Sequence, residues 1–238
     1  MVQHRLSIAA AADLKFAMDD LVARYRQTHP DTEVAVTYGS SGNFFAQLKN
    51  KAPFDLFFSA DIGYPRQLTE SGLAEKDSLF VYAVGRIVLW TPSDSKLDVT
   101  GRGLEALLDP AVKKVAIANP QHAPYGRAAE AALKKHLLWE QIEPKLVLGE
   151  NIAQAAQFVQ SGSADAGIIA LSLALAPQMK SRGQFYLIPL DDYPRLEQGG
   201  VILSCSSEKV TAREFRTYVT GPDGRAVLKQ YGFDLPGE

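Results

Sequence analysis

Short apolar runs alternate with stretches of helical period along the first 75 residues. The runs at 6–10, 34–38 and 54–59 are apolar, β-branched or aromatic, which is typical of buried strands. Between the first two runs, apolar residues recur at helical spacing, at Leu14, Met18, Leu21, Val22 and Tyr25. Strands that alternate with helices predict a mostly parallel sheet with helices on both faces.

The middle of the chain repeats this alternation. Further strands are predicted at 115–118, 145–148, 166–170 and 185–189. An apolar segment at 79–90 is longer than the strands before it and could run from one domain into another, and a return strand is predicted at 197–205. The sequence therefore predicts an α/β fold of two lobes, each a mixed, mostly parallel sheet flanked by helices. We expect lobe 1 at 1–82 plus 201–238 and lobe 2 at 83–200.

Composition excludes several classes of protein. The 238 residues are 46% hydrophobic and carry a net charge of −2, so no broad basic surface for nucleic acid or membrane is expected. No apolar run approaches the roughly 20 residues of a membrane span. The single cysteine, Cys205, cannot form an internal disulfide, and no Cys/His cluster has the spacing of a metal site. No signal peptide is evident, which is expected of a cytoplasmic protein or of a mature form with an added start Met.

One turn stands out chemically. Two glycines bracket Ser40 and Ser41 where a predicted strand gives way to a helix. A helix start offers unpaired N–H groups and the positive end of the helix dipole, so it suits an anion. A serine at this place could equally serve only as the helix cap.

Similar strand-to-helix junctions occur at 11–13, 124–126 and 151–152, so each predicted lobe has two. In open α/β sheets, ligands bind beyond the carboxyl ends of the strands, where such junctions lie. None of the four has Lys or Arg at its centre, and Arg127, just inside a helix, is expected to point away. Neutral, fixed donors can hold a fully ionised oxyanion that needs no proton.

Five motifs together resemble the periplasmic molybdate/tungstate-binding proteins of bacterial ABC importers, in order and over nearly the whole chain. They are Ala9–Leu14, Gly39–Gly42, Ala52–Asp61, Asn119–Gly126 and Ser161–Gly167. The resemblance implies a two-lobed periplasmic-binding-protein fold that closes on molybdate or tungstate and delivers it to a membrane permease. It also implies a periplasmic location, a monomer, no cofactor, no metal beyond the oxyanion itself and no catalysis. Closure is expected as a hinge motion near 82–85 and 198–200.

Carried over residue by residue, the resemblance places the ligand contacts on two turns of each lobe. The expected oxyanion-binding residues are Ala12, Asp13, Ser41, Tyr125 and Ile152. Some family members have a ligand tyrosine at the position of Ala170, and we expect Tyr125 to supply the phenol here.

Asp13 departs from the family, where Ser or Asn is common, because an ionised carboxylate repels a dianion. Three explanations remain open. Asp13 could cap the helix and offer only its backbone N–H, it could be protonated and donate its proton, or the ligand could be another oxyanion such as sulfate, phosphate or chromate.

Other polar residues have ordinary explanations. Asp55 and Asp61 are expected in turn or cap roles, His122 in a loop, and Cys205 as a small buried hydrophobe. A serine hydrolase that uses Ser40 or Ser41 with His122 is a competing hypothesis, although no Gly-x-Ser-x-Gly elbow is present. A sensor domain of a transcription regulator is disfavoured, because the chain is not basic and has no room for a helix-turn-helix.

Overall fold

The chain forms two compact units in the computed structural model, which describes residues 4–238. Residues 1–3, which the sequence prediction assigned to lobe 1, lie outside the described residues. Unit 1 comprises the chain up to Val84 together with Glu197–Glu238, and unit 2 comprises Gly85–Leu196. The chain thus passes between units twice, after Val84 and after Leu196. The lobe boundaries given above remain a prediction of where the units would separate experimentally.

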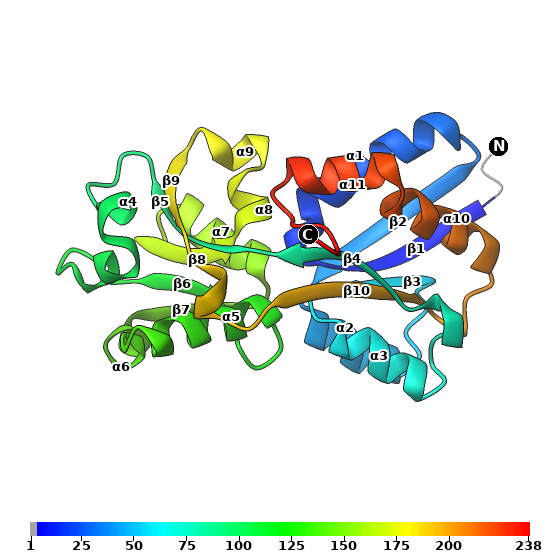
Figure 1. The fold of residues 1–238 in the computed structure, drawn as a ribbon, viewed down its shortest axis with the longest axis horizontal. Helices are drawn as coiled ribbons and strands as arrows, with labels where there is room; N and C mark the ends of the chain where they lie inside the picture. Colours follow the sequence, from blue (N-terminus) through cyan, green and yellow to red (C-terminus); the bar gives the residue numbers. More distant parts are fainter. Residues whose placement is uncertain (1–3) are drawn as a thin grey trace. The chain divides into compact units, whose positions relative to one another are not determined.

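Unit 1 is built on a five-stranded sheet of order β2-β1-β3-β10-β4 (Figure 1). Its strands are β1 (His4–Ala11), β2 (Thr32–Gly39), β3 (Leu56–Ser59), β4 (Phe80–Gly85) and β10 (Leu196–Ile202). Strand β1 runs parallel to β2 and β3, whereas β10 is antiparallel to β3.

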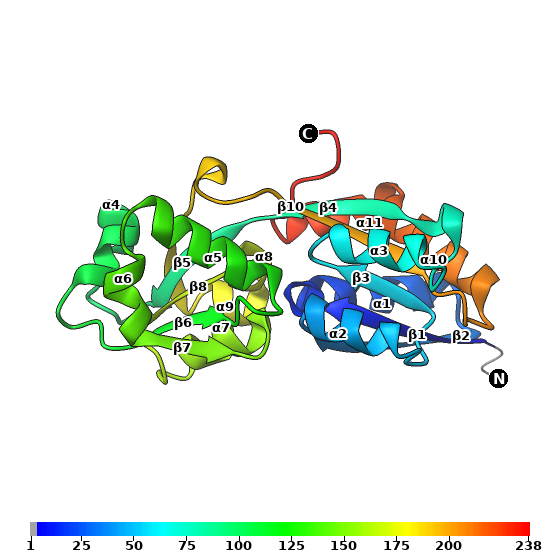
Figure 2. The same cartoon turned by 90° about the horizontal axis from the view of Figure 1, so that it is seen from below.

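Helices cover both faces of this sheet. They are η1 (Ala12–Leu14), α1 (Lys15–Thr28), α2 (Ser41–Lys49), α3 (Gly63–Glu70), η2 (Lys76–Ser78), α10 (Lys209–Thr220) and α11 (Pro222–Gln230). Helices α1, α10 and α11 lie together on one face, and α2 and α3 lie on the other (Figure 2). The apolar stripe predicted from Leu14 to Tyr25 is buried along its whole length, because this is the side of α1 that meets the sheet.

Unit 2 is built on a second five-stranded sheet, of order β7-β6-β8-β5-β9. Its strands are β5 (Ile87–Pro92), β6 (Val115–Ala118), β7 (Leu146–Gly149), β8 (Ala166–Ala170) and β9 (Gly183–Leu187). Strands β6, β7 and β8 are parallel, and β5 is antiparallel to β8 and β9.

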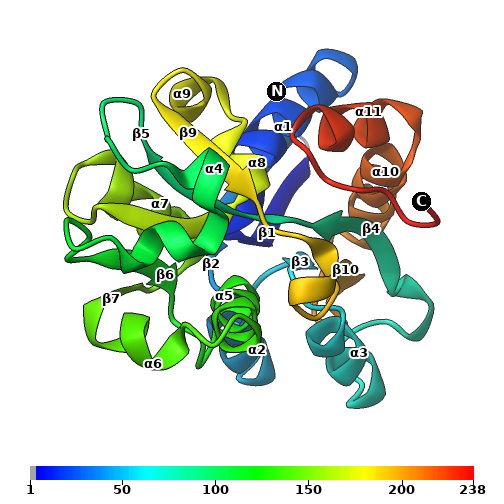
Figure 3. The ribbon, with the colours of Figure 1, turned by 60° about the vertical axis from the view of Figure 1, so that its left-hand side comes forward.

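Nine helical segments accompany this sheet among the described residues. They are α4 (Val99–Arg102), η3 (Gly103–Leu108), α5 (Pro124–Lys135), α6 (Trp139–Ile142), η4 (Glu143–Lys145), α7 (Ile152–Gln160), α8 (Leu171–Ala174), α9 (Pro177–Lys180) and η5 (Leu190–Asp192). Helices α5 and α6 lie on one side of the sheet, and α8 and α9 lie on the other (Figure 3).

The two units wind in the same way. In each sheet, the first of the three parallel strands lies between the second and the third. An antiparallel strand comes next, beside the third. The chain moves to one side of the first parallel strand to form the second, and then back to the other side to form the third. Because both β–α–β crossovers are right-handed, the two crossover helices lie on opposite faces of the sheet. The predicted fold of mixed, mostly parallel sheets flanked by helices is confirmed in both units.

Two details differ from the sequence prediction. The apolar segment 79–90 forms two strands rather than one, since the ladder breaks at Arg86 between β4 and β5. The prediction that Cys205 is buried is wrong, because it follows the end of β10 in a turn and its side chain is exposed.

Candidate functional site

The predicted contact residues of unit 1 gather at one edge of its sheet. Parallel strands β1, β2 and β3 all end there, at Ala11, Gly39 and Ser59. Antiparallel β10 begins at the same edge, with Gly199 paired to Ser59. The turns that lead into α1 and α2 therefore meet beyond the end of β3.

The two serines of the Gly-Ser-Ser-Gly turn have different roles. Ser40 is the N-cap of α2. Its hydroxyl oxygen accepts a hydrogen bond from the Asn43 backbone N–H, at an N···O distance of 3.4 Å. Ser41, the first residue of α2 and 1% exposed, accepts the Ala60 N–H through its hydroxyl oxygen at 2.9 Å. Since an oxygen that accepts this bond still carries its own hydrogen, the Ser41 hydroxyl is set up as a donor. The capping role thus belongs to Ser40.

Asp13 lies in η1, directly after β1, and is 1% exposed. Of the three explanations left open, the role of helix cap is wrong, because Ala11 occupies the N-cap position and no side chain caps this turn. The Asp13 Oδ2 atom instead accepts a hydrogen bond from Gln198 Nε2 at 2.7 Å. The carboxylate thus reaches past β3 to the start of β10, while the neighbouring Ala12, 2% exposed, opens the helical turn.

Gln198 is held in turn by Tyr82. The single hydrogen of the Tyr82 hydroxyl is shared between the Gln198 Oε1 at 2.9 Å and the Ser59 carbonyl oxygen at 3.1 Å. Burial, together with the charge of Asp13, raises the pKa of Tyr82 well above its ordinary value. The phenol therefore stays protonated and keeps its donor at any physiological pH.

Unit 2 places its two predicted turns side by side at the ends of β6 and β7. Ala118 pairs with Gly149 at the strand ends, and the Asn119 N–H donates to the Gly149 carbonyl at 2.8 Å. Helix α5 starts close to β6, since a Cβ atom on Gly126 would lie 2.1 Å from the Ala118 carbonyl oxygen. Glycine at this position permits the close approach of helix and strand.

Tyr125 and Ile152 occupy the first turns of these helices. Tyr125 is the second residue of α5, after Pro124, and is 2% exposed. Ile152 is the first residue of α7, where a backbone N–H has no acceptor within the helix. The side chain of Asn151 caps α7 by accepting the Gln154 N–H at 3.0 Å. Ala170, the position at which the resemblance raised a ligand tyrosine, is fully buried before α8.

Three supporting residues were not predicted from the sequence. They are Ala60, which donates to Ser41, and Gln198 and Tyr82, which form the chain that ends at Asp13. Gln198 precedes two glycines in a predicted strand, which was the signal available in the sequence, and the structure shows that it is fully buried.

Asp61 has the expected turn role, since it accepts the Gly63 N–H at 2.8 Å. The prediction of a turn or cap role for Asp55 is wrong, because its carboxylate accepts the Ser7 N–H at 2.8 Å and the Ser206 hydroxyl at 2.6 Å, from segments 48 and 151 residues away. Within residues 4–238, no group of three or more His, Cys, Asp or Glu could hold a metal ion. The helices of the same range include none long and apolar enough to cross a membrane.

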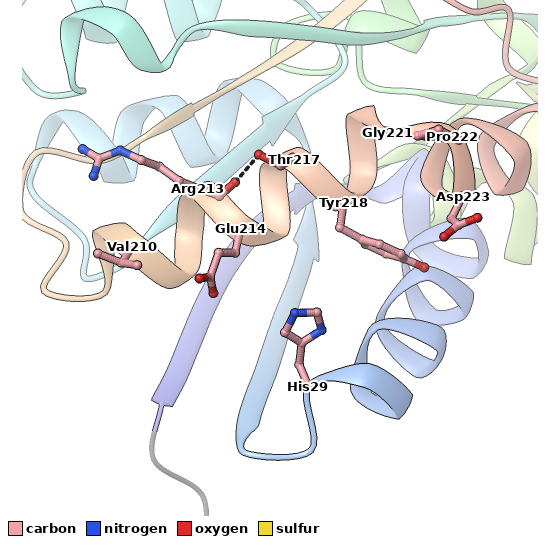
Figure 4. A pocket seen from close by; sticks show the side chains of 9 residues that line it. All are labelled: His29, Val210, Arg213, Glu214, Thr217, Tyr218, Gly221, Pro222 and Asp223. Atoms are coloured by element: carbon pink, nitrogen blue, oxygen red, sulfur yellow. Dashed lines mark hydrogen bonds between the residues drawn. The ribbon is translucent and has the colours of Figure 1, made fainter.

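A pocket of about 510 Å³ in unit 1 lies elsewhere (Figure 4). Its lining includes Arg213 and Tyr218 of α10, Pro222 of α11, and His29, which follows the C-terminal end of α1. Of the described residues that line it, none is a predicted contact residue, and His29 stands at the end of α1 remote from Asp13. The pocket is therefore separate from the turns that carry the predicted contact residues.

Comparisons with known proteins cover nearly the whole chain. The family model of bacterial extracellular solute-binding proteins matches residues 6–234. The chain is 36% identical over 232 residues to the molybdate-binding protein ModA of Azotobacter vinelandii, covering 97% of this chain and 90% of the relative. It is also 36% identical over 200 residues to the molybdate-binding protein ModA of Rhodobacter capsulatus, covering 84% and 77% of the two chains.

Solved structures agree. The A. vinelandii periplasmic molybdate-binding protein superposes with a TM-score of 0.91 at 31% identity, over 97% of this chain and 99% of that one. The sulfate-binding protein SubI of Mycobacterium tuberculosis reaches a TM-score of 0.80 at 14% identity, over 99% and 88%, which shows a shared fold alone. The predicted resemblance to molybdate-binding proteins is confirmed, and the chain belongs to the family of bacterial extracellular solute-binding proteins.

Proposed function

We propose that this protein binds the tetrahedral oxyanion molybdate and delivers it to the membrane permease of an ABC importer. The contacts would come from Ala12, Asp13 and Ser41 in unit 1 and from Tyr125 and Ile152 in unit 2. Relatives named for molybdate binding support the ligand. A Bacillus subtilis relative, 28% identical and named as a putative ABC transporter substrate-binding lipoprotein, supports the transport role.

The observation that carries the proposal is the arrangement around Ser41. Its oxygen already accepts the Ala60 N–H, so its hydrogen is the part that remains to be offered to an acceptor. It stands at the first residue of a nine-residue helix, where the dipole favours negative charge. A donor fixed in this way costs little reorganisation when an oxyanion binds.

The same arrangement argues against a hydrolase. A nucleophilic serine needs a general base to take its proton, and among the described residues the hydrogen bond of the Ser41 hydroxyl joins it to a backbone N–H and not to a histidine or carboxylate. We therefore infer binding without turnover and no cofactor. A periplasmic location and a monomer complete the proposal, since one-to-one delivery to a permease needs no oligomeric symmetry.

Thermal unfolding with equal concentrations of molybdate, tungstate, sulfate and phosphate tests the proposal. A ligand at about 100 times its Kd stabilises the native state by about 2.7 kcal/mol, which corresponds to roughly 5–10 °C in Tm for a chain of this size. We expect this shift with molybdate and tungstate. If Tm rises only with sulfate or phosphate, molybdate is not the ligand. Hydrolysis of ester or phosphoester substrates would instead favour the hydrolase hypothesis.

A further inference from the structure

A buried chain of three side chains joins the first ligand turn to the rest of unit 1. Gln198 Nε2 donates to Asp13 Oδ2 at 2.7 Å, and the Tyr82 hydroxyl donates to Gln198 Oε1 at 2.9 Å. Asp13, Tyr82 and Gln198 are each at most 1% exposed. In a buried site these bonds are stronger than in water, and a group left without its bond is costly.

The chain has a direction. The amide of Gln198 has one accepting end and one donating end. Because Tyr82 donates to the oxygen, the NH₂ group is turned toward the Asp13 carboxylate. The distance of 2.7 Å lies at the short end of the N–H···O range.

Gln198 and Tyr82, which orients it, both belong to the strands that connect the two units. Tyr82 lies on β4, two residues before Val84, where the chain leaves unit 1, and Gln198 directly follows Glu197, where the chain returns to it. The backbone beside Gln198 is closely packed, since a Cβ on Gly199 would lie 1.9 Å from Ile62 Cδ1 and 2.8 Å from the Phe80 carbonyl oxygen. The amide is thus presented from a backbone that has little room to shift.

We propose that Gln198, oriented by Tyr82, is a positioning residue for oxyanion binding: it holds the Asp13 carboxylate so that this turn meets the ligand with its backbone N–H. This inference rests on the proposed function. A carboxylate beside a dianion is repulsive, whereas a carboxylate that accepts a donated N–H has part of its charge balanced. Gln198 would therefore act through Asp13 and would not itself touch the ligand.

A double-mutant cycle tests this role by calorimetric titration with molybdate. Gln198→Leu removes the amide and keeps the side-chain bulk, and it is made both in the wild type and in Asp13→Ala. We expect Gln198→Leu to weaken binding at least about tenfold in the wild type, because a hydrogen bond to a charged group is lost. In the Asp13→Ala background the same change should alter Kd less than about twofold, since the group to be positioned is gone.

Tyr82→Phe is the gentler second variant. It removes the hydroxyl that orients the amide and keeps the ring that packs on Phe58 at a centroid distance of 5.3 Å. We expect it to weaken binding in the same direction, and again only when Asp13 is present. Thermal unfolding of each variant without ligand confirms that the protein remains folded.

The outcomes separate the two proposals. A wild-type protein that binds none of the four oxyanions refutes the proposed function and this inference with it. A wild type that binds molybdate, with equal losses from Gln198→Leu in both backgrounds, overturns the positioning role and leaves the function standing. An unchanged Kd in both Gln198→Leu and Tyr82→Phe overturns it as well.

Discussion

Ser41→Ala is the substitution that most directly probes the anion turn. It removes one hydrogen-bond donor to a charged ligand, which is expected to cost about 1–2 kcal/mol of binding. Because about 1.4 kcal/mol is a factor of ten in Kd, molybdate affinity should fall by roughly 5- to 30-fold. The substitution also leaves the buried Ala60 N–H without the hydroxyl oxygen that accepts its hydrogen bond at 2.9 Å. The ligand-free protein should therefore lose about 1–3 kcal/mol of stability.

Ser206→Ala is a matched control for this stability loss. Ser206 is also a buried serine of unit 1, 8% exposed, and it donates to Asp55 at 2.6 Å and accepts the Glu208 N–H at 3.1 Å. Asp55 precedes β3, so this serine lies at the opposite end of that strand from Ser41. Titration calorimetry and urea unfolding of both variants separate the effects. If Ser41→Ala binds molybdate as tightly as the wild type, or if Ser206→Ala weakens binding equally, the placement of the ligand at Ser41 is wrong.

Three further predictions concern Tyr125, Gly126 and Tyr25. Tyr125→Phe should weaken molybdate binding in calorimetry, and an unchanged Kd would mean that this turn contributes only its backbone. Gly126→Ala should lower both the urea midpoint and the affinity, because its Cβ would lie 2.1 Å from the Ala118 carbonyl oxygen and would push α5 away from β6; a wild-type midpoint would contradict the close packing. Burial raises the pKa of Tyr25 to about 12, so the stability due to its neutral phenol is complete below about pH 10 and is lost between about pH 10 and 12. Tyr25→Phe should therefore flatten the fall of the unfolding free energy over that range, and identical slopes for the two proteins would refute the shift.

The sequence predicted the strand-to-helix turns well because each signal is local. A strand, two glycines and a helix with a capping residue fall within about ten residues, and the strand from Ala166 to Ala170 was predicted with the bounds observed. The same local pattern left the choice between Ser40 and Ser41 open, since either serine can cap a helix. The Ala60 N–H, which distinguishes them, is 19 residues away from Ser41.

The explanation of Asp13 as a helix cap failed for a similar reason. Local propensity favours an aspartate cap at a helix start. In the fold, the Asp13 carboxylate instead accepts a hydrogen bond from buried Gln198, 185 residues along the chain. Nothing near Asp13 in the sequence reveals that β10 returns beside β3 with an amide at the right position. The break at Arg86 was missed because apolar residues continue on both sides of it.

Selectivity among oxyanions needs a physical basis other than charge. Molybdate and sulfate are both tetrahedral dianions, so helix dipoles and neutral donors attract them with nearly the same field. Discrimination must then depend on how far apart the donors are held. Under the proposed function, two features would set those positions, the Ser41–Ala60 bond in unit 1 and the close approach of Gly126 to Ala118 in unit 2. Loosening either support should therefore lower the ratio of molybdate to sulfate affinity, whereas a surface charge change should scale both affinities together.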